Sequence, residues 1–267
     1  MPSKLVLITG ASSGVGEATA KRFGAGGAHV LLLARDEARL ARVAEAIRSG
    51  GGTATTYSVD LQNIDATVEA AARLTREAGT PDLLINNAGA GRWIPLLETS
   101  AHEAAAMMAV PYLAAFTLTR SFAPAMIERG SGGIAFVSSP ASYLTWPNAS
   151  AYIAARHAVA GFAEALRSEL KPTGIFVTLV ILGRVDTPYW EHNPGSLENV
   201  PKTDKRLFPT LTPEEAADAI MQGMAGKKRV VVKPSMYRTL FVLNARFPKT
   251  VASRLRRAAK MARNTTE

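Results

Sequence analysis

Residues 4–16 read Lys4-Leu5-Val6-Leu7-Ile8-Thr9-Gly10-Ala11-Ser12-Ser13-Gly14-Val15-Gly16, and this stretch decides the fold of the chain. Residues 5–8 are an unbroken apolar run, which is typical of a strand buried on both faces of a parallel sheet. Residues 17–23 are rich in helix formers, and Gly24 can end that helix. A strand that turns through glycines into a helix directs backbone N–H groups and the positive helix end to one place. We expect an anion there, and a pyrophosphate fits best.

The glycine spacing is Gly-x-x-x-Gly-x-Gly, which differs from the Gly-x-Gly-x-x-Gly fingerprint of many dinucleotide-binding proteins. A tight strand-to-helix turn without any ligand would use the same residues. The later strands nevertheless supply further parts of a nucleotide site. We therefore expect the phosphates to contact Gly10, Ser12, Ser13, Gly14, Val15 and Gly16.

Apolar runs alternate with helical stretches along the rest of the chain. The expected strands are 5–8, 29–33, 54–59, 83–85, 134–137, 175–181 and 229–233, and helical periodicity covers 37–48, 64–77, 101–129 and 151–171. This alternation predicts an α/β fold: a single Rossmann-like, doubly wound domain with a seven-stranded parallel sheet and helices on both faces. We expect the domain to span 1–235, with a lid over a cleft at 186–213, and a helical extension to follow at 236–267.

Side chains after the second and third expected strands suit the adenosine half of a dinucleotide. Arg35 stands where such folds bind the ribose, and an arginine suits a 2′-phosphate whereas an acid suits a free 2′-hydroxyl. We therefore expect NADP(H) to be preferred over NAD(H), although Asp36 is adjacent and a solvated arginine at a helix start is the alternative. Asp60 can accept a hydrogen bond from adenine, with Leu61 against the base; capping the next helix is its alternative role.

The composition excludes several classes of protein. The chain has 267 residues, 47% of them apolar, no cysteine, and four scattered histidines without metal-ligand spacing. It has no uncharged apolar run of about 18 residues, and the short segment before the first strand leaves no room for a signal peptide. We expect a cytoplasmic protein without metal or disulfides.

The net charge of +9 is unevenly distributed. From Lys227 onward there are 12 Lys and Arg residues against a single acid, Glu267. Residues 1–226 carry 19 basic and 21 acidic side chains. The chain therefore combines a nearly neutral body with a basic tail.

Taken together, these patterns resemble the short-chain dehydrogenase/reductase family over residues 4–235. The resemblance is carried by the glycine turn, Asp60, the run Asn86-Asn87-Ala88-Gly89, Ser139, Tyr152 thirteen residues later, and Thr187. It implies a metal-free, NAD(P)(H)-dependent hydride transfer between an alcohol and a carbonyl. It also implies that the cofactor contacts Asn87, Ala88, Gly89, Tyr152, Arg156, Gly183, Val185 and Thr187.

The chemistry requires a proton donor beside the reacting carbonyl. Hydride transfer to a carbonyl leaves an alkoxide, which a tyrosine hydroxyl can protonate if a nearby cation favours the phenolate. A neighbouring serine hydroxyl polarises and positions the carbonyl oxygen. In the family pattern Tyr152 is the acid/base and Ser139 the orienting residue.

Three positions depart from that pattern. The family motif Tyr-x-x-x-Lys reads Tyr152-Ile153-Ala154-Ala155-Arg156, so the cation remains but cannot release a proton at accessible pH. Pro111 replaces an asparagine that interrupts the helix in the family and holds a relay water, and Leu182 replaces a proline. Two interpretations follow: a working reductase with Arg156 as electrostatic substitute, or a nucleotide-binding homologue with lost turnover that acts as sensor or scaffold.

Aromatic residues follow the carboxyl ends of several expected strands. We expect a substrate site lined by Trp93, Tyr143, Trp146, Tyr189 and Trp190, which favours a bulky hydrophobic ketone, aldehyde or alcohol. Core packing is the alternative for each ring, and Arg92 and Arg184 leave a small charged substrate open. By analogy with the family we expect a homodimer or homotetramer.

The tail joins an apolar segment at 237–248 to a basic helix that ends at Arg263. Val251, Leu255, Ala258 and Ala259 would form its apolar stripe, beside Arg254, Arg256, Arg257 and Lys260. Such a segment can lie on an anionic membrane surface, here the inner face of a membrane, through 236–263. A pair of helices that closes the cleft or a dimer contact is the alternative. Nucleic acid is not expected, because interleaved stacking aromatics are missing.

Overall fold

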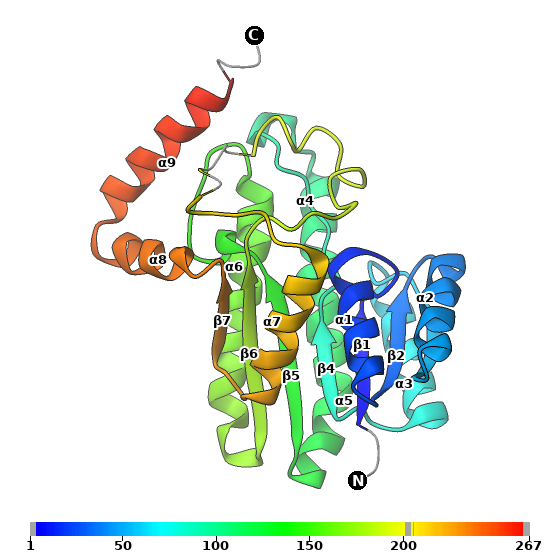
Figure 1. The fold of residues 1–267 in the computed structure, drawn as a ribbon. Coiled ribbons are helices and arrows are strands. Elements are labelled where there is room, and N and C mark those ends of the chain that lie inside the picture. Colours follow the sequence, from blue (N-terminus) through cyan, green and yellow to red (C-terminus); the bar gives the residue numbers. More distant parts are fainter. Residues whose placement is uncertain (1–3, 201–203, 205, 264–267) are drawn as a thin grey trace.

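The computed structural model describes residues 4–200, 204 and 206–263, with the backbone alone for 259–263. Seven parallel strands form one sheet in the order β3-β2-β1-β4-β5-β6-β7, which confirms the predicted fold (Figure 1). The observed strand bounds agree with the predicted ones to within two residues, and the first helix begins at Gly14, three residues earlier than expected. The strands are β1 (Leu5–Thr9), β2 (His29–Ala34), β3 (Thr53–Ser58), β4 (Leu83–Asn86), β5 (Gly132–Ser138), β6 (Ile175–Leu182) and β7 (Val230–Lys233).

Helices cover both faces of this sheet. Three lie on one face, α1 (Gly14–Ala25), α2 (Glu37–Ser49) and α7 (Pro213–Ala225), and three on the other, α3 (Ile64–Ala78), α5 (Ala115–Arg129) and α6 (Ser150–Leu170) (Figure 1). Alternation along β1 explains the two layers, since Leu7 packs in one apolar core and Val6 and Ile8 in the other. All three side chains are completely buried, as expected for a central parallel strand.

The helix predicted over 101–129 is interrupted. It consists of α4 (Ala101–Met108), a π-helical turn (Ala109–Ala114) and α5. Pro111 lies inside the π-helical turn, and a proline lacks the N–H that would bond to Met107 and crowds that carbonyl. The long helix is thus interrupted at Pro111. Three short 3₁₀ helices also occur, at Leu96–Glu98, Pro140–Ser142 and Lys171–Thr173.

Two helices follow the last strand, α8 (Met236–Arg246) and α9 (Pro248–Arg263). α8 lies beside the edge of the sheet, whereas α9 extends away from the body (Figure 1). The predicted stripe residues Val251, Leu255 and Ala258 face partly inward, and the side chains of Ala259 and Lys260 lie outside the described residues. None of the helices described here is long and apolar enough to cross a membrane.

Candidate active site

A cavity of about 920 Å³ lies where the strands of the sheet end. Its wall includes residues that directly follow β1, β2, β4, β5 and β6, because parallel strands bring their carboxyl ends to one edge. All the predicted site residues except Tyr143 line this cavity: Gly10, Ser12, Ser13, Gly14, Val15, Gly16, Arg35, Asp60, Leu61, Asn87, Ala88, Gly89, Trp93, Ser139, Trp146, Tyr152, Arg156, Gly183, Val185, Thr187, Tyr189 and Trp190.

The glycine turn between β1 and α1 has the backbone that its sequence suggested. Gly10 has φ +66° and Gly14 has φ +55°, a region that side-chain-bearing residues rarely adopt. At Gly16 a Cβ would overlap the carbonyl of Gly10 and lie 2.6 Å from Nδ2 of Asn87. The Ser13 side chain makes no capping hydrogen bond, so the first N–H groups of α1 face the cavity without that partner. The turn is a concave cradle of donors that suits an anion.

A threonine ties the glycine turn to the neighbouring loop. Oγ1 of Thr9 accepts hydrogen bonds from the N–H groups of Asn87 at 3.0 Å and Ala88 at 2.9 Å. The amide of Asn87 donates in return to the carbonyl of Thr9 at 3.0 Å. The loops after β1 and β4 are thereby held in register, which fixes the central wall of the cavity. The sequence alone did not indicate this role of Thr9.

The structure separates the two roles considered for Asp60. The residue that caps α3 is Asn63, whose side chain accepts from the N–H of Ala66 at 3.0 Å. Asp60 accepts from the N–H of Gln62 at 3.0 Å and lies at the cavity wall, beside the buried Leu61. Asp60 is therefore not the helix cap.

Arg35 lies at the rim of the cavity with an exposed side chain. The adjacent Asp36 caps α2 by accepting from the N–H of Arg39 at 2.9 Å, and it forms an ion pair with Nε of Arg39 at 3.1 Å. The carboxylate next to Arg35 is thus already engaged within α2. Two guanidinium groups, those of Arg35 and Arg39, border this part of the cavity.

Tyr152 and Ser139 meet inside the cavity. Tyr152 lies in the first turn of α6 and Ser139 directly follows β5; the tyrosine hydroxyl donates to Oγ of Ser139 at 3.2 Å. The same Oγ accepts from the N–H of Ala141 at 3.2 Å, which fixes the serine rotamer. Two hydroxyl groups therefore converge on one point of the cavity, as polarisation and protonation of a carbonyl oxygen would require.

Arg156 lies one helical turn after Tyr152 and is buried. Its Cζ is 4.8 Å from the centre of the Tyr152 ring, and a Cβ on Gly89 would lie 2.9 Å from one of its terminal nitrogens. Burial acts to lower the pKa of Arg156, but the neighbouring Tyr152 and Tyr189 outweigh this effect and raise it above its usual range. Residue 156 is therefore a permanent cation beside the phenol. Its Nε has no hydrogen-bond partner within the described residues.

Aromatic rings surround Tyr152. The Trp93 ring lies 5.5 Å from the Tyr152 ring and 5.7 Å from the Trp146 ring, centre to centre. Tyr189 donates its hydroxyl to the carbonyl of Gly91 at 2.6 Å, and burial and Tyr152 together raise its pKa. Tyr143 does not join them: it is not part of the cavity wall, and its ring packs 5.1 Å from Phe241 of α8, centre to centre.

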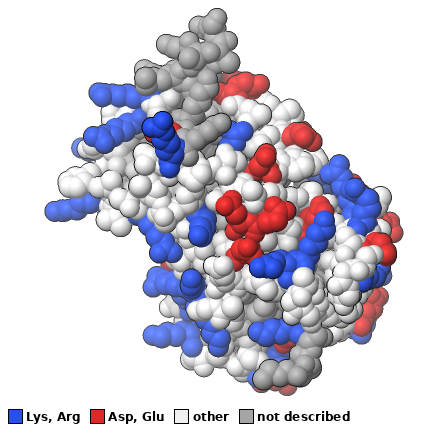
Figure 2. Space-filling model, viewed as in Figure 1, with Lys and Arg blue, Asp and Glu red and all other residues white. Residues whose placement is uncertain are grey.

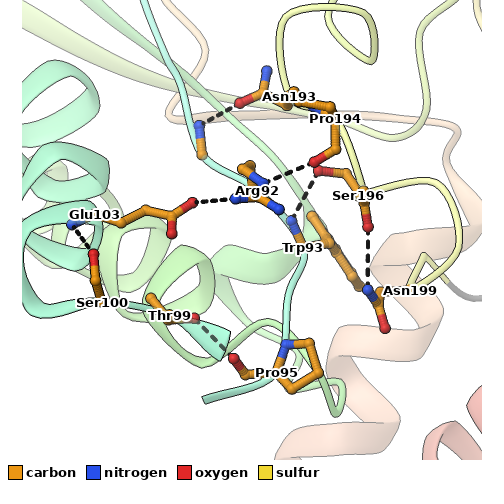
Figure 3. A network of polar contacts seen from close by, with 12 residues as sticks. Arg92, Trp93, Pro95, Thr99, Ser100, Glu103, Asn193, Pro194, Ser196 and Asn199 are labelled. Carbon is orange, nitrogen blue, oxygen red and sulfur yellow. Dashed lines mark hydrogen bonds and ion pairs between the residues drawn. The ribbon is translucent and has the colours of Figure 1, made fainter. Parts of the chain in front are cut away.

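The predicted lid contributes to the roof of the cavity. Of 186–213, the cavity wall includes Thr187 to Trp190, residues between His192 and Val200, and Phe208 and Thr210, while 201–203 and 205 lie outside the described residues. Asn193 and Ser196 are buried polar residues within it. Their oxygens accept from the N–H groups of Gly91 and Trp93 at 3.0 and 3.1 Å (Figure 3).

A charged side chain strengthens the same junction. Arg92 donates from Nε to the carbonyl of Pro194 at 2.7 Å and pairs with the Glu103 carboxylate at 3.1 Å (Figure 3). No sequence pattern indicated Asn193 and Ser196, because neither lies in a periodic segment. The only signal was their position on either side of the turn-forming Pro194-Gly195 pair.

Two curated proteins resemble the chain over most of its length. An uncharacterized oxidoreductase of Mycobacterium bovis is 37% identical over 236 residues, which cover 86% of this chain and 67% of that protein. The probable oxidoreductase EphD of Mycobacterium tuberculosis is 33% identical over 266 residues, which cover 94% of this chain. This chain spans 44% of EphD, less than half of that relative's length.

The family model described as short chain dehydrogenase matches residues 4–195. Among solved structures, a short-chain dehydrogenase from Sphingobium yanoikuyae in complex with NADPH superimposes with a TM-score of 0.79 and 27% identity, covering 92% of this chain and 95% of that one. Further solved structures with this fold are complexes with NADP or NAD.

Proposed function

This chain belongs to the short-chain dehydrogenase family, and from that premise we propose that it is an oxidoreductase that prefers NADP(H) and interconverts a hydrophobic ketone or aldehyde and the corresponding alcohol. The main support for this proposal is that the Tyr152 hydroxyl and Oγ of Ser139 are 3.2 Å apart and line the same cavity as the glycine turn. A proton donor and a nucleotide cradle thus share one space, which supports chemistry on a molecule held between them.

Two features fit a nicotinamide dinucleotide. The glycine turn leaves no room for a Cβ at Gly16 and presents the N–H groups of α1, as a pyrophosphate requires. Nε of Arg156 is buried without a partner in the described part of the chain, so a ribose hydroxyl that accepted from it would remove an unfavourable desolvation. When bound, the cofactor supplies or accepts the hydride.

The side chains supply the proton and the geometry. In the reducing direction the substrate oxygen accepts hydrogen bonds from Tyr152 and Ser139, and Tyr152 transfers its proton to that oxygen. The Arg156 cation stabilises the phenolate that remains. Because an arginine does not release a proton at accessible pH, it cannot act as a relay, and water in the cavity returns the proton to Tyr152.

The preference for NADP(H) follows from the adenosine end. The exposed Arg35 guanidinium and the neighbouring Arg39 suit a 2′-phosphate, and the one adjacent acid, Asp36, is held within α2. At the other end of the cavity Trp93, Trp146, Tyr189 and Trp190 offer apolar rings around the reacting hydroxyls, which supports a bulky hydrophobic substrate.

A second function is favoured by the geometry of Arg156. Its guanidinium lies over the Tyr152 ring and fills the space beside Gly89 that a Cβ would need, where a lysine would place a compact ammonium group. If that bulk excludes the nicotinamide ring from Tyr152, the chain binds NADP(H) without turnover and acts as a sensor or scaffold.

One experiment separates these functions. Kd values for NADPH and NADH are measured by fluorescence titration for the wild type, Arg35→Ala and, as control, Arg76→Ala on α3, followed by a screen of hydrophobic ketones for NADPH oxidation. We expect the wild type to bind NADPH more tightly than NADH and to oxidise NADPH in the presence of some ketones. Arg35→Ala should weaken NADPH binding at least about tenfold, and Arg76→Ala should leave it unchanged. Tight binding without turnover would assign the second function, and failure to bind either cofactor would reject both.

A further inference from the structure

Three apolar side chains stand on the outer side of α8 and at its end. Val242 is 69% exposed, Leu243 45% and Phe247 55%. Single exposed apolar residues are common on protein surfaces, but here three occur within six positions. They form an apolar strip on the outside of the molecule.

The opposite side of α8 already attaches the helix to the body. Tyr237 packs against Phe208 at 4.7 Å, and Phe241 packs against Tyr143 at 5.1 Å. Nδ2 of Asn244 donates to the carbonyl of Tyr143 at 3.0 Å. The outer strip is therefore not required to hold α8 in place, and its exposure calls for another explanation.

Exposed cations accompany the apolar strip along α8 and α9. The exposed basic side chains on α8 and the described part of α9 are Arg238, Arg246, Lys249, Arg254, Arg256 and Arg257. Residues 234–266 contain no acid. Blue side chains accordingly predominate over α8 and the described part of α9, at the upper left of Figure 2. These six cations and the apolar strip are called the α8–α9 surface below.

We propose that the α8–α9 surface docks the protein on a membrane that contains anionic lipids. Val242, Leu243 and Phe247 enter the boundary between headgroups and acyl chains, while the arginines and Lys249 contact lipid phosphates. The combination of apolar and cationic side chains selects this partner. A nucleic acid would offer phosphates to the cations but no apolar surface to the aliphatic side chains. A second copy of the chain, related by a two-fold axis, would bring cations next to cations.

Docking would also bring the cavity close to the lipid. Tyr237 lines the cavity from the inner side of α8, while the apolar strip lies on the outer side of the same helix. A hydrophobic compound dissolved in the membrane would then have a short path to the cavity. The docking itself does not depend on the proposed reaction, because it uses none of the residues around Tyr152.

Co-sedimentation of the full-length protein with vesicles tests this proposal. Vesicles of phosphatidylcholine alone are compared with vesicles containing about one-third phosphatidylserine, at ~0.1 M and ~0.5 M salt. The charge variant combines Arg246→Gln with Arg254→Gln, and the apolar variant combines Val242→Ser with Phe247→Ser. Their matched controls are Arg76→Gln with Arg120→Gln, and Val68→Ser with Ile127→Ser, all at exposed positions of α3 and α5. Unchanged circular dichroism establishes that each variant is folded.

We expect the wild type to bind the anionic vesicles and to be released by high salt. The charge variant should bind about 30-fold more weakly, which corresponds to about 1 kcal/mol for each cation. The apolar variant should bind at least about tenfold more weakly, and both controls should bind as the wild type does.

Failure of the wild type to bind anionic vesicles would overturn the proposal. So would binding that neither variant weakens. If the protein instead binds duplex DNA and only the charge variant loses that binding, the partner is a nucleic acid. If sedimentation equilibrium shows an oligomer that the apolar variant dissociates, and vesicles do not bind, the surface is a subunit interface.

Discussion

At the scale of single residues, Arg156 combines three properties that seldom occur together. It is charged, it is buried, and its Nε lacks a partner within the described residues. An isolated buried charge is costly, so its retention beside Tyr152 calls for a stabilising partner or a function. The nearby Tyr152 ring and a bound cofactor ribose together would provide that partner.

Tyr152→Phe tests the role of the phenol. Because the variant removes the proton donor but no apolar contact, we expect kcat to fall about 10²- to 10⁴-fold while the Kd for NADPH changes little. Tyr143→Phe is the matched control, since that hydroxyl lies outside the cavity and its removal should leave kcat unchanged. Stopped-flow and steady-state assays of NADPH oxidation provide the measurement. Equal effects of the two variants would exclude Tyr152 as the acid/base.

Arg156→Lys tests the role of the cation through its pH dependence. Since the pKa of Arg156 is raised, its charge persists at every pH at which the protein is assayed. Burial lowers the pKa of a lysine, so the variant should lose the cation as pH rises. We expect the kcat of Arg156→Lys to decline at a lower pH than the kcat of the wild type. For Arg156→Met, which lacks the charge altogether, we expect kcat to be about 10²-fold lower at all pH values. Identical profiles for wild type and Arg156→Lys would contradict this role, and turnover found only in the lysine variant would favour the second function.

The sequence indicated most of these residues because parallel strands end at one edge of a sheet. Residues directly after β1, β4 and β5 therefore had to come together, as Gly10, Asn87 and Ser139 do. Tyr143 was expected beside them, but it lies five residues beyond the end of β5, and its ring packs against Phe241 of α8. Trp146 lies farther along the same loop and does line the cavity, so the position of a strand end does not decide which side chains of a loop reach the site.

At the scale of elements, the interrupted α4–α5 segment and the roof of the cavity are the parts that sequence patterns described least well. The apolar periodicity of 101–129 continues through the π-helical turn, so only Pro111 signalled the break. The roof has no periodicity at all. It is held by side-chain to backbone hydrogen bonds between segments about 100 residues apart, which no local pattern reveals.

Asn193→Ala tests whether these bonds hold the roof. The variant leaves the N–H of Gly91 without its acceptor and removes the donor to the carbonyl of Tyr189, each worth about 1–3 kcal/mol when buried. We expect faster amide hydrogen exchange at 91–93 and 189–199 and a raised KM, with little change in the rest of the sheet. Asn199→Ala, which loses one bond to Gly195 in the same segment, is the control and should have a smaller effect. Uniformly faster exchange across the chain would show a general loss of stability instead.

At the scale of the whole molecule, the excess of positive charge lies in the C-terminal part of the chain, and the predicted site residues precede it. The strongly basic part of the sequence begins at Lys227, after all the predicted cofactor and catalytic residues. The architecture was predictable because buried parallel strands are continuous apolar runs separated by helices. The placement of α8 and α9 was not predictable from the sequence, because an amphipathic helix can pack on its own domain, on another subunit or on a membrane.

The most direct test of the account is a crystal structure of the protein soaked with NADPH. We predict that the pyrophosphate contacts the N–H groups at the start of α1 and that the 2′-phosphate lies beside Arg35. The nicotinamide ring should lie within about 5 Å of the Tyr152 hydroxyl, so that a substrate can contact both at ~3–3.5 Å. An empty groove, or a ring held away from Tyr152 by the Arg156 side chain, would contradict the proposed reaction.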